Sequence, residues 1–399
     1  MKAEVLGRGI RVGMNGNSAV AYAVKQADVD VVAAYPITPQ TIMVERLAEY
    51  VNNGELNAAF IPVESEHSAL STCVGASLAG ARVFTATASQ GLALMYEILW
   101  IAAGLRTTIV MALGNRAFSP NINIHCSHDD AYAARDAGWI QFFAENVQEA
   151  YDLVLQAFRI SEDKDVLFPS IVNLDGFILT HSLEALNVLK DEEVKEFLPP
   201  KDPVNPIDPD NPMTYGPLDL QDYYIEHRRQ QAEHFKASYP KIVKILNEYS
   251  EFTGRKYSPV KTYALEDADI GIMILGSSAG TVRYTVDRLR EKGMKVGVVS
   301  LTLYRPFPIE DIKKVVKGLK VLAIMDRSYS FGSPGAQLYM DVSTALYNLR
   351  ERPLLFNVIY GLGGRDLTPE HVELIARRAE EVAREGEVKE TQIWVGVRE

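Results

Sequence analysis

Residues 61–91 read IPVESEHSALSTCVGASLAGARVFTATASQG, and this stretch indicates the fold of the first half of the chain. An apolar segment leads into two glutamates and a histidine at 64–67. Small residues then predict a buried helix over 68–80, followed by a strand over 82–85 and a hydroxyl- and glycine-containing turn at 87–91. A glutamate at the start of a buried helix requires a partner or a function, because an unpaired buried charge is costly.

The same alternation of apolar strands and helices continues on both sides of this stretch. Nearly continuous apolar runs are typical of parallel strands that helices cover on both faces. We therefore predict a doubly wound parallel sheet for the first half of the chain. The expected strands are 29–34, 60–63, 107–113 and 168–173. The segment 91–104 is apolar on all sides and predicts one buried helix.

Capping residues predict where two further helices begin. Thr38 and Pro39 fit the cap and the first position of a helix, and Thr368 and Pro369 form the same pair ahead of the last helix. The segment 35–40 thus joins a buried strand to a helix start. Such a junction is a ligand-binding edge in an open α/β sheet.

The middle of the chain separates two similar halves. Prolines recur among Asp and Asn in 188–218, which predicts a linker without helix or interior strand, and helical spacing in 219–253 predicts one long connecting helix. We expect an α/β fold with two doubly wound, open parallel-sheet domains, joined by this Pro-rich linker and long helix. The expected parts are 1–187, 188–259 and 260–399.

The composition excludes several classes of protein. A net charge of −11 without a basic run argues against a nucleic-acid surface, and the apolar runs are too short for a membrane span. The first residues lack the pattern of a signal peptide. The cysteines, Cys73 and Cys126, are too few to ligate an iron–sulfur cluster and favour a reducing, cytoplasmic setting.

Two charged residues are candidates for catalysis. Glu66, if buried, could hold a proton on a ring nitrogen of an aminopyrimidine, although a helix cap or an ion pair is the simpler interpretation. Arg116 follows the strand expected at 107–113 and could pair with a substrate carboxylate, where the alternative is a structural ion pair.

The polar segment 125–130 reads His-Cys-Ser-His-Asp-Asp and could bind zinc. Its histidines are three residues apart with no second ligand pair at a recognised spacing, so a polar active-site loop is the preferred interpretation. We predict no metal ligands on this chain. The glycine-rich segment 361–364 could cradle a phosphate, but it lacks the P-loop pattern and favours a tight turn.

A hydrolase is the main alternative to these interpretations. Residues 276–280 match G-x-S-x-G between a strand and a helix, with Ser278 as the nucleophile and Asp326 and His371 following in hydrolase order. No HGGG-type oxyanion loop accompanies the motif. A non-catalytic assembly scaffold is the third possibility.

The motifs resemble, in order, those of the 2-oxoacid:ferredoxin oxidoreductases, and most closely the alpha subunit of multi-subunit pyruvate:ferredoxin oxidoreductases (pyruvate synthase). The resemblance covers nearly the whole chain. The motifs that carry it are Tyr35-Pro36-Ile37-Thr38-Pro39, Glu64-Ser65-Glu66-His67, residues 84–91 (FTATASQG), Asn115-Arg116-Ala117, residues 135–139 (RDAGW), residues 304–308 (YRPFP) and residues 361–366 (GLGGRD).

This resemblance implies a shared cofactor and several partners. The first domain would bind the pyrimidine of thiamine diphosphate, and the second would be a transketolase C-terminal-like domain. A beta subunit would carry the diphosphate and Mg2+ site, and gamma and delta subunits would carry the [4Fe-4S] clusters. This agrees with the low cysteine count, and with the lack of a Gly-Asp-Gly motif followed by a metal-binding Asn. The reaction would convert pyruvate and coenzyme A reversibly to acetyl-CoA and CO2, with ferredoxin as the electron acceptor.

The resemblance also implies roles for individual residues. Glu66 would contact the pyrimidine nitrogen and promote activation of the cofactor, while Glu64 would be structural. Arg116 and Thr38 would bind the substrate carboxylate. The cofactor pocket would be lined by Pro36, Thr87, Ser89 and Gln90, and the substrate loop would contain Asn115, His128 and Asp130. Because 127–130 reads Ser-His-Asp-Asp where the family often has Asp-His-x-Asp, 2-oxoisovalerate and 2-oxoglutarate remain alternative substrates.

Overall fold

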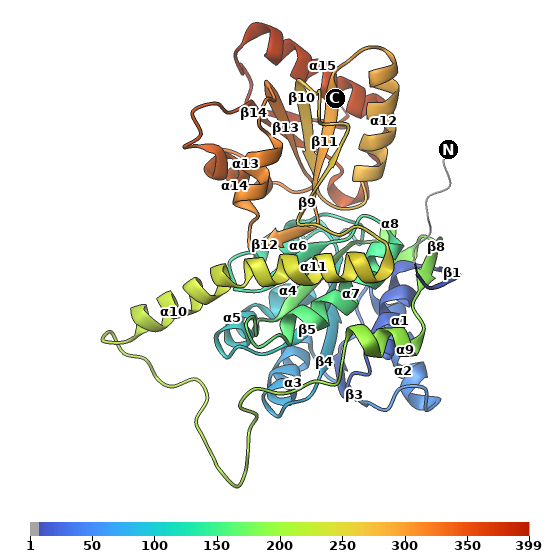
Figure 1. Cartoon of the computed structure of the whole chain (residues 1–399), viewed down its shortest axis with the longest axis vertical. Coiled ribbons are helices and arrows are strands. Elements are labelled where there is room, and N and C mark those ends of the chain that lie inside the picture. The colour runs from blue at the N-terminus through green and yellow to red at the C-terminus, as the bar shows by residue number, and fades with distance from the viewer. Residues whose placement is uncertain (1–7, 399) are drawn as a thin grey trace.

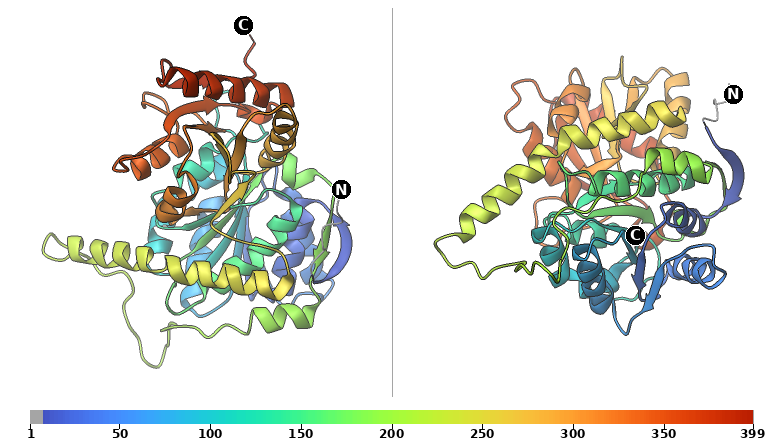
Figure 2. Two further views of the ribbon diagram at one scale, coloured as in Figure 1. Left: turned by 45° about the horizontal axis from the view of Figure 1, so that its top comes forward. Right: turned by 60° about the horizontal axis from the view of Figure 1, so that its bottom comes forward.

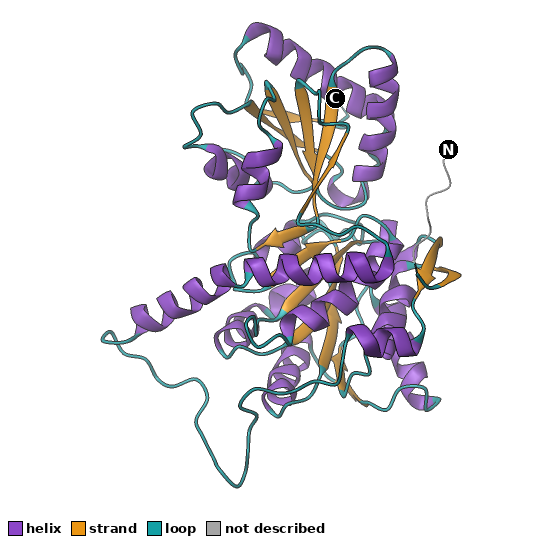
Figure 3. Cartoon of the chain, in the orientation of Figure 1, coloured by secondary structure: helices purple, strands orange, loops and turns teal. Residues whose placement is uncertain are grey.

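The computed structural model describes residues 8–398, in which two sheets with flanking helices lie one above the other (Figures 1 and 3). The larger sheet consists of β2 (Val31–Ala34), β3 (Ala59–Pro62), β4 (Val83–Thr87), β5 (Ile109–Asn115), β6 (Ile140–Phe143), β7 (Ser170–Asp175) and β12 (Leu303–Arg305). Its order is β12-β6-β7-β5-β4-β2-β3, and only β12 runs antiparallel to its neighbour. Its central strands β4, β5 and β7 are buried throughout, as expected for parallel strands between two helical layers.

The smaller sheet has the order β15-β14-β13-β10-β11-β9, with only the edge strand β9 antiparallel. Its strands are β9 (Val260–Tyr263), β10 (Ile270–Ile274), β11 (Val296–Leu301), β13 (Val321–Asp326), β14 (Leu354–Ile359) and β15 (Gln392–Trp394). A separate two-stranded ribbon pairs β1 (Ile10–Met14) with β8 (Glu184–Val188). The predicted α/β class with two mainly parallel sheets is confirmed.

The helices of the first half surround the larger sheet. They are α1 (Gly16–Gln26), α2 (Thr41–Asn52), α3 (Glu66–Leu78), α4 (Ser89–Leu94), α5 (Tyr96–Gly104), α6 (Asp129–Ala133), α7 (Val147–Ser161), α8 (Ile178–His181) and α9 (Asp191–Phe197). The second half contains α10 (Tyr224–Ala237), α11 (Tyr239–Thr253), α12 (Ala279–Glu291), α13 (Ile309–Val315), α14 (Gln337–Leu346), the 3-10 turn η1 (Leu362–Gly364) and α15 (Pro369–Glu385). No helix within residues 8–398 combines the length and the apolar character needed to cross a membrane.

The two predicted helix starts have different outcomes. Thr368 caps α15 with Pro369 in its first turn, as predicted. The start at Thr38 and Pro39 is wrong, because α2 begins only at Thr41. Tertiary hydrogen bonds hold the preceding turn instead: Asn17 Nδ2 donates to the Pro39 carbonyl at 2.9 Å.

Two single predicted helices are each divided in the structure. The segment 91–104 lies in α4 and α5, and it is not buried on all sides, because Leu94, Tyr96 and Ile101 are exposed. The segment 219–253 forms α10 and α11, which meet at Ser238; α11 packs along the larger sheet's layer, whereas α10 projects away from it (Figure 2).

The predicted linker is partly helical, and one strand crosses between the two halves. Helix α9 occupies the beginning of 188–218, ahead of the prolines that keep the remainder irregular. Strand β12 pairs with β6 in the larger sheet, although it follows β11 of the smaller one. The YRPFP motif at 304–308 therefore begins where the second half of the chain returns to the first.

Candidate active site

Glu66 begins α3 and is almost enclosed by the protein. Ser65 caps this helix with its hydroxyl oxygen, so the Glu66 side chain is not needed as a cap. The residue is 7% exposed, and none of residues 8–398 donates a hydrogen bond to its carboxylate or forms an ion pair with it. A nearly buried acceptor without a donor indicates that its partner comes from outside the chain.

Gly91 brings Glu66 and Thr87 together. A methyl group placed on Gly91 would lie 2.3 Å from Thr87 Oγ1 and 2.6 Å from Glu66 Oε1. A side chain at this position would displace the Thr87 hydroxyl and the Glu66 carboxylate from their places, so glycine allows both to keep them. The Thr87 hydroxyl is itself buried and has no hydrogen-bond partner within residues 8–398. We call Glu66, Thr87 and Gly91 the Glu66 edge. The glycine of this turn is visible in the sequence, but the sequence does not indicate which side chains approach it.

Ser89 holds the turn that connects β4 to α4. It is fully buried and has a positive φ of 44°, which is unfavourable for a residue with a side chain. Its Oγ lies 2.7 Å from the Ala117 carbonyl and 2.6 Å from Gln90 Oε1. Its backbone N–H donates to Asp130 Oδ2 at 3.0 Å. These contacts stabilise a strained conformation beside the Glu66 edge.

Asp130 connects the ends of β4 and β5. Oδ2 accepts from the backbone N–H groups of Ser89 and Arg116, and Oδ1 accepts from Asn115 Nδ2 and the Ala131 N–H, all at 2.8–3.0 Å. Complete burial raises the pKa of the Asp130 carboxyl to about 6, against the lowering effect of these four donors. Asp130 therefore fixes the backbone of both turns.

Arg116 is nearly buried and is held by backbone carbonyl groups. Its Nη1 donates to the Thr38 carbonyl at 3.0 Å and its Nε to the Asn123 carbonyl at 3.2 Å. Thr38 thus contacts Arg116 through its backbone, while Thr38 itself is exposed. No ion pair occupies the guanidinium within residues 8–398, so it is available to an anion.

Gln40 holds the turn that contains Pro36 and Thr38, a role that the sequence pattern did not indicate. Its amide nitrogen lies 2.9 Å from the Tyr35 carbonyl and 3.3 Å from the Ala86 carbonyl. Pro36 is exposed on this turn. The fold thereby gathers most of the predicted residues at the carboxyl ends of β2, β4 and β5.

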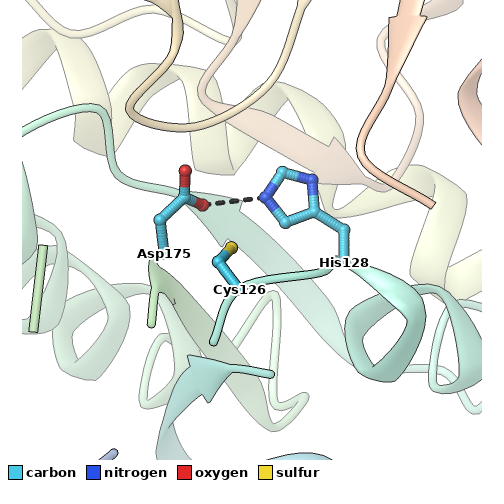
Figure 4. Close-up of side chains that lie close together, drawn as sticks. All are labelled: Cys126, His128 and Asp175. Carbon is cyan, nitrogen blue, oxygen red and sulfur yellow. Dashed lines mark hydrogen bonds and ion pairs between the residues drawn. The ribbon is translucent and has the colours of Figure 1, made fainter. Parts of the chain in front are cut away.

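His128 lies in a different environment, together with Cys126 and Asp175 (Figure 4). His128 Nε2 is 2.8 Å from Asp175 Oδ1, and Asp175 Oδ2 accepts from Arg327 Nη1 at 3.1 Å and Ser277 Oγ at 2.6 Å. All except Ser277 are buried. We call these five residues the Asp175 junction, since Ser277 and Arg327 come from the second half of the chain.

The Asp175 junction has the separations of a metal site but a different chemistry. Ligand atoms of Cys126, His128 and Asp175 lie within 4.8 Å of one another. Burial raises the pKa of the Cys126 thiol well above its usual range, so the sulfur keeps its proton. Burial opposes ionisation of Asp175 as well, but His128 and Arg327 outweigh it and hold the pKa of that carboxyl well below its ordinary value. The carboxylate is already saturated, which favours a structural junction.

The hydrolase prediction is wrong, because its three residues have other partners. Ser278 Oγ accepts from Arg327 Nη2 at 2.8 Å. Asp326 accepts from the N–H groups of Leu338 and Tyr339 and from Asn357. His371 lies in the first turn of α15, where its Nδ1 accepts from the Thr368 N–H. No Ser–His–Asp relay exists among them.

Two family profiles match consecutive parts of the chain. Residues 22–247 match "Pyruvate flavodoxin/ferredoxin oxidoreductase, thiamine diP-bdg", a thiamine-diphosphate-binding family. Residues 268–372 match "Pyruvate:ferredoxin oxidoreductase core domain II". The first match contains every residue of the Glu66 edge, together with Arg116 and Asp130.

Several curated proteins are similar over their full length. Pyruvate synthase subunit PorA of Thermotoga maritima is 50% identical over 394 residues, and that of Pyrococcus furiosus is 47% identical over 390; each alignment covers 98% of both chains. Ketoisovalerate oxidoreductase subunit VorA of Pyrococcus horikoshii is 43% identical over 387 residues, covering 96% of this chain and 98% of the relative.

Two solved structures share the fold at low sequence identity. The 2-oxoglutarate:ferredoxin oxidoreductase of Magnetococcus marinus aligns with a TM-score of 0.70 and 21% identity, covering 94% of this chain and 65% of that chain. A split gene transketolase aligns with a TM-score of 0.56 and 12% identity, covering 94% and 100% respectively.

Proposed function

The chain belongs to the pyruvate flavodoxin/ferredoxin oxidoreductase family, and from this premise we propose that it is the alpha subunit of a multi-subunit pyruvate:ferredoxin oxidoreductase. The complex would convert pyruvate and coenzyme A reversibly to acetyl-CoA and CO2, with ferredoxin as the electron acceptor. The observation that carries this proposal is the Glu66 edge, where a nearly buried carboxylate and a buried hydroxyl have no hydrogen-bond partner within residues 8–398. Asp130 joins the neighbouring Ser89 turn to the backbone of Arg116, whose guanidinium has no ion pair among the same residues.

The Glu66 edge fits the aminopyrimidine end of thiamine diphosphate. A ring nitrogen and an amino group would supply the donors that Glu66 and Thr87 lack, and Gly91 keeps the approach to them open. When bound, this cofactor supplies the nucleophilic carbon and the electron sink for decarboxylation. Glu66 would hold a proton at the ring nitrogen, and Pro36, Ser89 and Gln90 would shape the pocket around it.

Arg116 would bind the carboxylate of the 2-oxoacid. Two backbone carbonyls fix its guanidinium, so little entropy is lost when a carboxylate pairs with it. Asn115 and Asp130 would act by holding the Arg116 backbone, and His128 by anchoring the end of the loop. Pyruvate is the preferred substrate because the PorA relatives are more similar to this chain than the VorA relatives. With 2-oxoisovalerate the same site would have to admit a branched chain.

The chain would supply only part of the complete enzyme. Its relatives carry the name "subunit", and its cysteines, Cys73 and Cys126, are both buried and cannot ligate clusters. A beta subunit would contribute the diphosphate and Mg2+ site, and gamma and delta subunits the [4Fe-4S] clusters. The exposed apolar residues of α4 and α5, Leu94, Tyr96 and Ile101, lie near the Glu66 edge in the sequence and offer a surface for the beta subunit.

A purified complex assayed on a panel of 2-oxoacids tests this proposal. Pyruvate, 2-oxoisovalerate and 2-oxoglutarate would be compared, each with coenzyme A and a low-potential dye as electron acceptor. We expect the highest kcat/KM with pyruvate and no turnover by this chain alone. A higher kcat/KM with 2-oxoisovalerate would change the substrate assignment, and full turnover by the isolated chain would contradict the subunit proposal.

A further inference from the structure

A glycine turn of the second half of the chain forms hydrogen bonds with the loop that follows Arg116. The turn, Gly361–Gly364, comes directly after β14, and the loop covers residues 117–128. Asn123 Nδ2 donates to the Gly363 carbonyl at 3.1 Å, and the Gly363 N–H donates to Ser127 Oγ at 3.0 Å. The Gly364 N–H donates to the Cys126 carbonyl at 2.8 Å. Residues more than 230 positions apart are thus joined by three hydrogen bonds.

The turn can approach this loop only because its residues are glycines. Gly363 and Gly364 both have positive φ, at 62° and 78°. A methyl group on Gly363 would lie 2.3 Å from Asn123 Nδ2, and one on Gly364 would lie 2.5 Å from His125 Cβ. A side chain on Gly363 would displace the Asn123 amide, and one on Gly364 would displace His125, in addition to straining the backbone.

Asn123 connects the glycine turn to Arg116, because its side chain bonds to Gly363 and its backbone carbonyl bonds to Arg116. Its side chain is fixed at both ends, since Nδ2 donates to Gly363 and Oδ1 accepts from the His125 N–H at 2.7 Å. Its backbone carbonyl accepts from Arg116 Nε at 3.2 Å. The His125 carbonyl in turn accepts from the Ala117 N–H at 3.0 Å, which closes the loop beside Arg116.

The two hydrogen bonds of the guanidinium determine which of its edges remains free. Nε donates to the Asn123 carbonyl, and one N–H of Nη1 donates to the Thr38 carbonyl. Arginine has five N–H donors, so the three that remain all belong to Nη1 and Nη2. This pair of nitrogens can bind a carboxylate through two parallel hydrogen bonds. The Asn123 carbonyl therefore selects the edge of Arg116 that faces an incoming anion.

We infer that Gly363, through Asn123, is a positioning residue for the substrate carboxylate, so that the second half of the chain sets the affinity for the 2-oxoacid. This inference rests on the proposed function, in which Arg116 binds that carboxylate. Neither Gly363 nor Asn123 touches the cofactor in this scheme. Displacing them should weaken substrate binding more than it slows the chemical step.

Gly363→Ala in the complete complex tests the inference, with Gly386→Ala as the matched control. Gly386 also has a positive φ, of 73°, but it ends α15 in open space, so alanine there adds the same kind of backbone strain without moving the loop. We expect the KM for pyruvate to rise by roughly tenfold to a hundredfold in Gly363→Ala, with kcat changing less than about threefold. Gly386→Ala should leave both constants near wild type. Asn123→Ala, which removes the bridge without backbone strain, should raise KM as well.

The double variant Gly363→Ala/Arg116→Ala distinguishes an effect that acts through Arg116 from a general disturbance of the fold. If Gly363 acts through Arg116, Gly363→Ala should raise KM no further when Arg116 is already absent. An unchanged KM in Gly363→Ala, or an equal increase with and without Arg116, would overturn the inference.

Hydrogen exchange gives an answer that does not depend on turnover. Amides in 117–128 should exchange faster in Gly363→Ala than in Gly386→Ala, and equal rates would count against the inference. A wild-type complex that accepts no 2-oxoacid would instead refute the proposed function.

Discussion

The Glu66 edge and the Asp175 junction are both nearly closed to solvent, but their polar atoms are satisfied to different degrees. At the junction, His128, Arg327 and Ser277 all hydrogen-bond to the Asp175 carboxylate. At the Glu66 edge, the carboxylate has no partner among residues 8–398 and the Thr87 hydroxyl is unpaired. Arg327 Nε is the one buried side-chain nitrogen or oxygen of the junction without a partner within residues 8–398, but the Asp175 carboxylate itself is fully paired. Because burial without hydrogen bonds costs free energy, a paired carboxylate indicates a structural role, and we interpret an unpaired carboxylate beside an unpaired hydroxyl as a ligand site.

The largest expected effect tests the unpaired region. Glu66→Gln in the complex should lower kcat by roughly 10²- to 10⁴-fold, because an amide cannot exchange a proton with the cofactor ring. The steady-state rate with pyruvate measures this loss. Stability of the chain should change little, since no partner in the described structure loses a hydrogen bond.

Glu64→Gln is the matched control for this substitution. Glu64 is two residues away and exposed, and its carboxylate accepts from the Ser68 hydroxyl. Its kcat should remain within about twofold of wild type, as for surface substitutions away from a site. An equal loss of kcat in both variants would contradict a specific catalytic role for Glu66.

The second prediction addresses the paired region. Asp175→Ala should lower the free energy of unfolding by about 3–5 kcal/mol, because it leaves Arg327 buried without its counter-charge. Urea denaturation of the purified chain measures this. Asp287→Ala serves as a control, since Asp287 is exposed and, among the described residues, accepts only from the Tyr263 hydroxyl. A small decrease in the free energy of unfolding of Asp175→Ala would contradict a structural role for the Asp175 junction.

Acid should weaken the same junction. The folded-state pKa of Asp175 lies below its unfolded value because His128 and Arg327 outweigh the opposing effect of burial. Its contribution is therefore complete above the unfolded pKa, near 3.9, and is lost as the pH falls below it. Urea denaturation at decreasing pH should show a steeper loss of stability for wild type than for Asp175→Ala.

The contribution of Asp130 to the free energy of unfolding has the opposite pH dependence to that of Asp175. The pKa of Asp130 is raised by burial to about 6, above an unfolded value near 3.9. The folded chain thus binds more protons than the unfolded chain between about pH 4 and 6, so the free energy of unfolding decreases as the pH rises through this range. In Asp130→Asn this decrease should become smaller but not vanish, because burial also raises the pKa values of Asp129 and Asp326 to about 6. A wild-type profile unaffected by the substitution would exclude Asp130 as the titrating group.

The smallest effect is expected at Ser278. Ser278→Ala removes the acceptor of one hydrogen bond from Arg327, which is worth about 1–3 kcal/mol for a buried charged donor. The rate with pyruvate should remain near wild type, and no ester hydrolysis should be detectable in either protein. A large loss of turnover would extend the catalytic site into the second half of the chain.

Local sequence patterns predicted the elements better than the connections between them. The last helix begins where Thr368 and Pro369 indicated, because capping involves only neighbouring residues. Thr38 and Pro39 have the same pattern without starting a helix, since the distant Asn17 donates to the Pro39 carbonyl and the adjacent Gln40 bonds back to the Tyr35 carbonyl. The exposed face of α5 was not predicted, because an apolar composition alone does not show which face of a helix is left uncovered by the rest of the chain.

The sequence by itself determined the alternation of strands and helices and the position of Glu66 and Arg116 at the ends of strands. It also contained the small residues, such as Gly91 and Gly363, without indicating what they approach. Only the tertiary structure decided that β12 returns to the larger sheet, that Asp175 pairs with His128 and Arg327, and that Gly363 reaches Asn123. The reason is that propensity and capping act between neighbours in the chain. Pairing depends on contacts between distant residues, such as Asn123 and Gly363 at 240 positions apart, which form only when the chain has folded.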